Sequence, residues 1–463
     1  MRNKRIIALI MTLVMLFAMA ATAMADAALT DGEVGGFTAE DTPVSQDKSV
    51  KIAKELTVYN ADETKIYAPT VSYTYTITAG PEGTSITDET TDHASGEAVT
   101  VTTVAGITTG LKVNGTAGTT GTIAWVPTEE VDALSTGAPN IKYLTLDFSD
   151  VVFGATGVYR YTISEAITGS YAASGVTETD LDTNPHVRYL DVYVKPADEV
   201  TNGGNAAGDW DIYGYVCVIN DEEITPDGDT NTQGAVKTNG FVAGTVTRED
   251  VAYSADSYYT YNVKISKTVT NDAYAKATHA FPFTVIFTNA AVTQPVDISY
   301  KSEGTVGGFK DPATAALSAG NTKGIVTLMD SSWVKYIGIP CGTKTEVYET
   351  NDVTGTIYNV STKVDTADAV AENVTSGSTP SEAAAQSDTK ADYQSTKTVF
   401  TPAVDTNDTV SHVIAVTNNL QNISPTGLMF RYGPYVLTLL GGILLLFLGV
   451  KFLRRSKKEN ETA

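Results

Sequence analysis

Alternating hydrophobic and polar positions run through most of the chain between its two ends. Clear examples are residues 71–77, 189–194, 212–218 and 281–287, which are rich in Tyr, Val, Ile, Phe and Thr. Turn-forming segments rich in Gly, Pro and Asn separate these runs. A period of two with β-branched and aromatic residues predicts strands. Helical periodicity is confined to the ends, so we expect an all-β protein built from β-sandwiches.

A weak internal repeat divides this strand-rich region. Residues 50–56 and residues 263–269 have the same order of apolar residues around a lysine. The repeat predicts tandem immunoglobulin-like β-sandwich domains at 48–245 and 258–420, after a flexible leader at 26–47.

Each opening strand carries a lysine on its apolar face. Strand alternation places Lys54 and Lys267 among Val, Ile and Leu side chains of the same face. A lone buried ammonium costs several kcal/mol, so each lysine should be neutral or paired. Glu165, Glu349 and Asn418 lie on similar apolar faces of later strands, and we expect them to be the buried polar partners.

The first 25 residues have the pattern of a secretory signal peptide. Arg2, Lys4 and Arg5 precede an apolar run at 6–21, and small residues at 23 and 25 predict cleavage before Asp26. The alternative is an uncleaved membrane anchor.

The C-terminal region, 423–463, combines a short motif, an apolar span at 434–453 and a basic tail. Such a span is long enough to cross a bilayer as one transmembrane helix, and the positive tail would stay cytoplasmic. The motif that precedes it is Ser424, Pro425, Thr426 and Gly427 after Ile423. This arrangement resembles the cell-wall sorting signal of Gram-positive surface proteins, although Ser424 replaces the first proline of the commonest motif. The alternative is a simple single-span membrane protein.

Composition narrows the function classes. The chain has 54 Asp and Glu against 31 Lys and Arg, a net charge of −23, which disfavours nucleic-acid binding. It has two cysteines, Cys217 and Cys341, and four isolated histidines. We therefore expect no metal site, no cofactor and no enzymatic turnover.

The order of these features resembles backbone pilins of Gram-positive bacteria, of the streptococcal isopeptide-linkage type. The resemblance implies a spontaneous intramolecular Lys–Asn isopeptide bond in each domain, promoted by a buried acid. It assigns Lys267, Glu349 and Asn418 to the second domain and Lys54 and Glu165 to the first. The first-domain acceptor is ambiguous: Asn239 is the better candidate and Asn220 the poorer. The alternative in each domain is a buried ion pair without a bond.

The same resemblance implies a structural subunit of a cell-surface pilus or stalk. A sortase would cleave after Thr426 and join the chain to a peptidoglycan precursor or to a neighbouring pilin subunit, with the membrane contacted only through the precursor's span. Polymerisation also needs an acceptor lysine, for which Lys237 is the candidate. The alternative is a monomeric wall-anchored adhesin that binds a host or microbial ligand.

Overall fold

The computed structural model describes the parts of the chain in which strands were predicted. These are residues 48–88, 99–178, 186–196, 210–219, 238–246, 251–253, 255–307, 315–319, 322–351, 358–365, 367–368, 393–400, 411–420 and 435–451. The predicted signal peptide and leader, Lys237, Asn220 and the sorting motif lie outside them.

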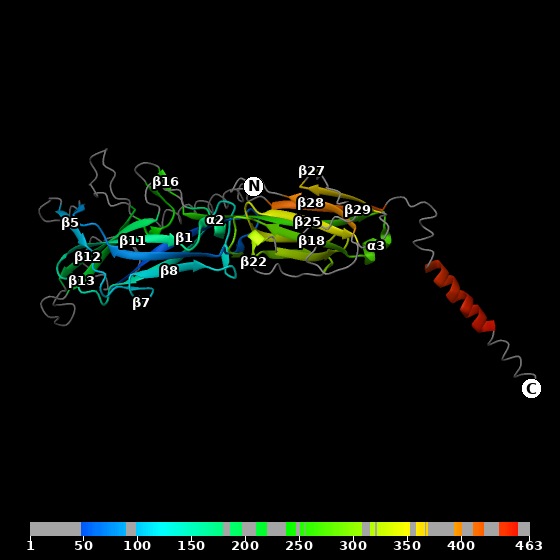
Figure 1. The fold of residues 1–463 in the computed structure, drawn as a ribbon, viewed down its shortest axis with the longest axis horizontal. Helices are drawn as coiled ribbons and strands as arrows, with labels where there is room; N and C mark the ends of the chain where they lie inside the picture. Colours follow the sequence, from blue (N-terminus) through cyan, green and yellow to red (C-terminus); the bar gives the residue numbers. More distant parts are fainter. Residues whose placement is uncertain are drawn as a thin grey trace, which may run out of the picture.

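Strands form nearly all of the regular structure, which confirms the all-β prediction. The chain folds as an elongated body with strands along its length (Figure 1). One 11-stranded sheet runs through both halves. Its strands are β1 (Ser49–Tyr59), β6 (Lys112–Val113), β7 (Thr116–Ala117), β10 (Ala138–Asp147), β14 (Gly240–Phe241), β17 (Asp256–Thr270), β20 (Ser299–Glu303), β24 (Trp333–Pro340), β26 (Tyr358–Val364), β27 (Ala367–Asp368) and β29 (Ser411–Leu420).

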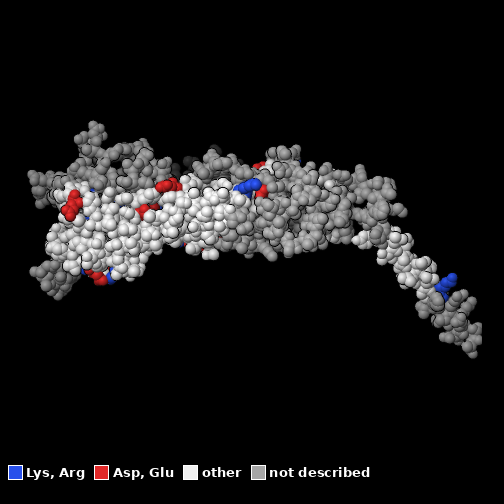
Figure 2. All heavy atoms as spheres, in the orientation of Figure 1, with Lys and Arg blue, Asp and Glu red and all other residues white. Residues whose placement is uncertain are grey.

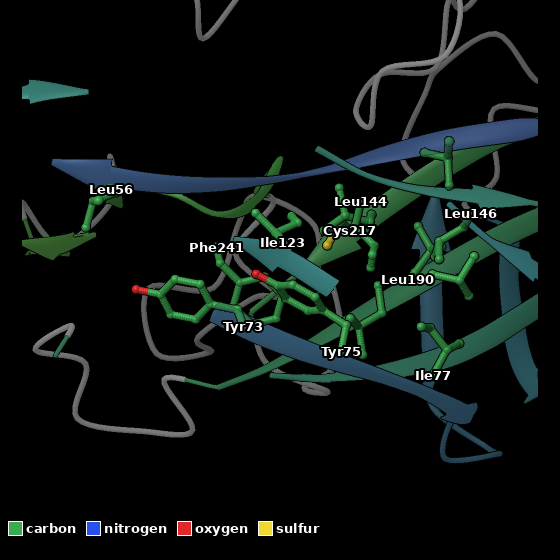
Figure 3. Packing of buried hydrophobic residues seen from close by; sticks show 14 of the residues in the cluster. Leu56, Tyr73, Tyr75, Ile77, Ile123, Leu144, Leu146, Leu190, Cys217 and Phe241 are labelled. Carbon is green, nitrogen blue, oxygen red and sulfur yellow. The ribbon is translucent and has the colours of Figure 1, made fainter. Parts of the chain in front are cut away.

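A separate sheet packs against the first half of the long sheet. It consists of β3 (Val71–Ala79), β4 (Ser85–Asp88), β5 (Val99–Ala105), β8 (Thr120–Trp125), β11 (Gly157–Ile167), β12 (Val187–Pro196) and β13 (Trp210–Val218). Alternate residues of both sheets fill the core between them. In Figure 3, Tyr73, Tyr75 and Phe241 lie together in this core. Because the two layers share one hydrophobic cluster, this half is a β-sandwich.

The second half repeats this arrangement. Its other sheet consists of β18 (Phe281–Thr288), β21 (Val306–Gly307), β23 (Thr322–Leu328), β25 (Lys344–Asn351) and β28 (Tyr393–Phe400). A second cluster, which contains Ile265, Phe283 and Val416, fills the space between the layers. The immunoglobulin-like topology expected for the two sandwiches stays a prediction.

Short elements complete the described chain. Two-stranded pairs join β2 (Lys65–Tyr67) to β9 (Glu130–Asp132), β15 (Gly244–Val246) to β16 (Val251–Tyr253), and β19 (Pro295–Val296) to β22 (Ala315–Ala316). The short helices are α2 (Tyr171–Ser174), α3 (Ala273–Thr278) and the 3₁₀ turn η1 (Leu317–Ala319).

Strand β17 belongs to both sandwiches. Its first residues, 256–259, pair in parallel with the end of β1, and its later residues pair with β29 and β24. A register shift between Tyr261 and Val263 marks the change. The predicted boundary between the domains therefore falls within a continuous sheet, and β17 begins at Asp256, before the predicted start at 258.

Polar side chains also make contacts where β17 passes from one sandwich to the other. Asn60 Nδ2 donates to Asn262 Oδ1 at 3.0 Å, and Asn262 Nδ2 donates back to Asn60 Oδ1 at 2.9 Å, with both residues fully buried. Asn60 Nδ2 also donates to Thr260 Oγ1 at 3.0 Å. Nearby, Lys335 Nζ lies 2.9 Å from Glu63 Oε1. These contacts connect the end of β1 and the residues after it to β17 and β24.

The C-terminal region contains a helix at 435–451, at one end of the molecule (Figure 1). In the part of the chain that is described, no helix combines the length and the apolar character needed to cross a membrane.

The Asn60–Asn262 pair gives a direct test of the junction. The change Asn262→Ala removes both reciprocal hydrogen bonds and leaves Asn60 buried without them, which should lower the free energy of unfolding by about 2 kcal/mol. The measurement is the denaturant midpoint, with the exposed Asn239 replaced by Ala as the control. An unchanged midpoint would mean that this pair does not stabilise the junction.

Candidate functional site

The second sandwich holds a buried Lys–Glu–Asn group. Lys267 on β17 donates from Nζ to Glu349 Oε2 at 2.7 Å, with the two side chains 0% and 1% exposed. Asn418 on β29 donates from Nδ2 to the other carboxyl oxygen, Oε1, at 2.6 Å. Glu349, on β25 of the opposite sheet, thus bridges the lysine and the amide. The structure brings together the three residues predicted for this domain.

The surroundings of Lys267 are apolar. Its Nζ lies 4.2 Å from the centre of the Phe281 ring. Removal from water lowers the pKa of Lys267 to about 8, against the opposing effect of Glu349. Among described atoms, Asn418 Oδ1 is buried without a hydrogen-bond partner. An amine of lowered pKa and an amide carbonyl without a hydrogen bond therefore lie in the same buried site.

The first sandwich holds a corresponding group with a different acceptor. Lys54 on β1 donates from Nζ to Glu165 Oε1 at 2.9 Å and to Asp256 Oδ2 at 2.7 Å. All three side chains are at most 2% exposed. Tyr75 donates its hydroxyl to Glu165 Oε2 at 2.6 Å. Burial raises the pKa of Tyr75 well above its usual value, which keeps this hydroxyl protonated.

Strand register shows that the two groups are equivalent. Lys54 lies two residues before Leu56, which pairs with Asp256. Lys267 lies two residues before Val269, which pairs with Asn418. In both cases the two strands run parallel. Asp256 therefore holds the position in the first site that Asn418 holds in the second.

The acids are equivalent in the same way. Glu165 pairs across the sheet with Tyr75, and Glu349 pairs with Phe283. The ring beneath each lysine comes two residues earlier: the Nζ–ring distance is 4.1 Å for Lys54 over Tyr73, against 4.2 Å for the second site. The repeat inferred from the sequence thus extends to the side chains around each lysine.

Asn239, the acceptor predicted for the first domain, does not face Lys54. Its side chain is exposed, and its backbone carbonyl accepts from Ala53 N–H at 2.9 Å. The next residue, Gly240, has φ of 141°, and a Cβ there would lie 2.3 Å from Ala53 O. The backbone therefore passes close to β1 at this point while the Asn239 side chain lies in solvent, and the residue that contacts Lys54 is Asp256.

Asp256 was missed because it follows the predicted end of the first domain. It is also eleven positions before Lys267, and strict alternation would place the two on opposite faces of β17. In the structure Asp256 does lie in the core of the first sandwich and Lys267 in the core of the second. A search for a carboxylate as well as an amide, continued into the next domain's first strand, could have found it.

The chemistry available at both sites is amide formation. Each site offers an amine, a carboxyl group that can carry a proton, and a carbonyl carbon that can lose water or ammonia. Among the residues described, no cluster of His, Cys, Asp and Glu could hold a metal ion.

Comparisons with known proteins find a family model and several solved structures. A family model described as a domain of unknown function (DUF7601) matches residues 261–401. The match includes Lys267 and Glu349 and ends before Asn418. No curated protein matches the chain.

Among solved structures, the chain resembles streptococcal pilins. A major pilin (T3.2) from Streptococcus pyogenes is 19% identical, with a TM-score of 0.34, over 82% of this chain and 100% of that one. Another S. pyogenes major pilin is 15% identical, with a TM-score of 0.34, over 80% and 99%. A Mobiluncus mulieris adhesin with disulfide, isopeptide and ester cross-links is 10% identical, with a TM-score of 0.22, over 81% and 99%.

Proposed function

We propose that this protein is a structural subunit of a cell-surface pilus or stalk, cross-linked internally at two sites. One observation carries the proposal: each sandwich core holds a lysine and a carbonyl acceptor on neighbouring parallel strands, with a glutamate that reaches the lysine from the opposite sheet. Burying such groups without reaction is costly, and a hydrophobic core would serve stability better. Formation of a covalent bond would explain why these groups are buried despite the unfavourable free energy.

In the second site, the Lys267 amine attacks the Asn418 side-chain carbonyl carbon. A new C–N bond forms, the bond to Nδ2 breaks, and ammonia leaves. Glu349 contacts both groups, so it can take the proton from the amine and give it to the leaving nitrogen. Holding the groups in contact supplies the proximity that the uncatalysed reaction lacks.

In the first site, the Lys54 amine attacks the Asp256 carboxyl carbon and water leaves. Glu165 is the corresponding proton carrier. Each site reacts once per molecule, so neither amounts to enzymatic turnover, and no cofactor is needed.

The two bonds would convert the folded chain into a tension-resistant unit. They would close segments of 202 and 151 residues (256 − 54 and 418 − 267). The loop-entropy relation gives about 5 kcal/mol of stabilisation for each, as an idealised value. Tension would pass from Lys54 through β17 to Asn418 by covalent bonds, bypassing most hydrogen bonds of the sheets. This property suits a fibre subunit.

Surface attachment is the second part of the proposal. A secretory signal at 1–25 would export the chain, and the span at 434–453 would hold the precursor at the membrane. A sortase would cleave after Thr426 and transfer the chain to a neighbouring subunit or to a peptidoglycan precursor. The charged side chains that Figure 2 shows on the described part of one face are scattered, without a continuous basic patch.

Intact mass tests the cross-links. We expect the purified chain to weigh less than its sequence by one ammonia and one water. Lys267→Ala should abolish only the ammonia loss, and Lys54→Ala only the water loss. Full sequence mass in the unaltered chain would overturn both bonds.

The acceptor assignment has its own test. In Asp256→Asn the first site should still react, but it should lose ammonia in place of water, so the chain loses two ammonia molecules. The matched control is Asn239→Ala, which should leave the mass loss unchanged. If Asn239→Ala prevents the first bond, Asp256 is not the acceptor.

The rate at which the second bond forms should be constant around neutral pH and should fall at higher pH. The reaction needs a neutral Lys267 amine and a protonated Glu349 carboxyl. This reactive pair holds the same number of protons as the ion pair of ammonium and carboxylate, because the two forms differ only by a proton transfer between the residues. The rate should therefore be level around neutral pH. Desolvation lowers the pKa of Lys267 to about 8, so above that pH the shared proton leaves and the rate should fall about tenfold per pH unit.

The measurement is ammonia loss over time after unreacted chain, purified in denaturant, is refolded at a series of pH values. Lys54→Ala is the control background, because it removes the first reaction. A rate that keeps rising above pH 8 would exclude Glu349 as the acid.

Sortase processing is tested in cells that express the matching sortase. The unaltered chain should give a ladder of covalent species on denaturing gels, and Thr426→Ala should abolish it. Lys237→Arg tests the predicted acceptor in the same way. A monomer alone, from the unaltered chain with active sortase, would favour the adhesin alternative.

A further inference from the structure

A histidine connects the first site to solvent. The imidazole Nδ1 of His186 lies 3.5 Å from Glu165 Oε1, and its Nε2 lies 2.7 Å from Glu178 Oε1. Glu165 is 1% exposed, His186 30% and Glu178 51%. The three side chains therefore form a series from the sealed core to the surface. The backbone holds it in place, since Glu165 N–H donates to the His186 carbonyl at 2.8 Å.

Before the lysine nitrogen attacks, the first site needs one more proton than the second. In the second site the acceptor is a neutral amide, so the Lys267 ammonium can supply the single proton that Glu349 must carry. In the first site the leaving oxygen of Asp256 must be protonated to leave as water. If Glu165 is also to polarise the carbonyl, two protons are required before the attack, and the Lys54 ammonium releases its second proton only after the new C–N bond has formed. One proton is therefore borrowed from outside the core and returned after the reaction.

His186 lies beside Glu165, in the site that needs the additional proton. Glu165 has an imidazole beside it, whereas in the described part of the second sandwich no imidazole lies within ion-pair distance of Glu349. The opposite oxygen of Glu165 is occupied by the Tyr75 hydroxyl, whose proton is firmly held. Oε1, which also contacts Lys54, is therefore the oxygen that a proton from solvent can reach.

We propose that His186 is the proton relay of the first site, carrying a proton from solvent to Glu165 for the reaction between Lys54 and Asp256. This inference rests on the proposed cross-link. The imidazolium gives its proton to Glu165 Oε1, the Lys54 nitrogen bonds to the Asp256 carbonyl carbon, and the hydroxyl oxygen of Asp256 leaves as water. Glu165 then returns the borrowed proton to His186. The net reaction is an ammonium and a carboxylate giving an amide and water.

The groups that face His186 set its protonation. Glu165 of β11 lies on one side, Glu178 of the segment after α2 on the other, and Tyr171 of α2 stacks on the ring at 5.9 Å with its hydroxyl 3.4 Å from Nδ1. Glu165 is the main cause that raises the pKa of His186 above its usual value, with a further contribution from Glu178. At a given pH, His186 is therefore protonated in a larger fraction of chains than a free imidazole would be.

The test follows both reactions in one molecule. Full-length chain, purified unreacted in denaturant, is refolded at several pH values and sampled by high-resolution intact mass. Water loss reports the first bond and ammonia loss the second. In His186→Gln we expect water loss to slow about 100-fold, a usual size for a lost proton-transfer group, with ammonia loss unchanged. In the unaltered chain the water-loss rate should fall as pH rises through the titration of His186, and this inflection should vanish in the variant.

A second variant separates proton transfer from packing. In His186→Ala, added imidazole should restore water loss, because the side chain is partly exposed and leaves an accessible space. Glu178→Gln should slow water loss less than His186→Gln does. A wild-type rate and pH profile in His186→Gln would overturn the relay, as would failure of imidazole to rescue a correctly folded His186→Ala chain. Absence of water loss from the unaltered chain would instead overturn the Lys54–Asp256 bond itself.

Discussion

The structure depends on a lysine placed in the dry centre of each sandwich. A buried amine is unfavourable unless an acid and an acceptor reach it. In this protein the lysine and those partners come from three strands in two sheets, so burying each lysine requires the whole sandwich to be assembled. The aromatic ring beneath each Nζ completes the enclosure. The same constraint that makes these lysines costly makes them suitable nucleophiles once folding is complete.

Strand β17 connects the two sites. It supplies Asp256, which contacts Lys54, to the first core and Lys267 to the second. The two sandwiches therefore cannot be treated as independent modules, because the first site is incomplete without the strand that opens the second half. The buried Asn60–Asn262 pair holds the strand in place at the crossing. A rigid junction and two linked cores are consistent with a subunit that transmits tension along its length.

The two sites differ in ways that follow from one substitution. In the first site Glu165 lies beside a histidine and accepts from a tyrosine hydroxyl, whereas in the second site Glu349 accepts from Asn418. Under the proposed cross-links, this difference would let the first site borrow a proton from solvent. Equivalent register with different acceptors thus leads to different leaving groups and a different connection to solvent.

The sequence by itself determined the all-β class, the repeat and the second site, because strand alternation reports which face a residue takes. Lys54, Lys267 and Glu349 could be found by that rule. Only the tertiary structure decided which carboxylate contacts Lys54 and which side chains neighbour Glu165. Asp256 and His186 reach their site through pairing between strands far apart in the chain, and the outward turn of Asn239 depends on a close backbone contact at Gly240. Local patterns fix the face of a strand, whereas register between distant strands fixes which side chains meet.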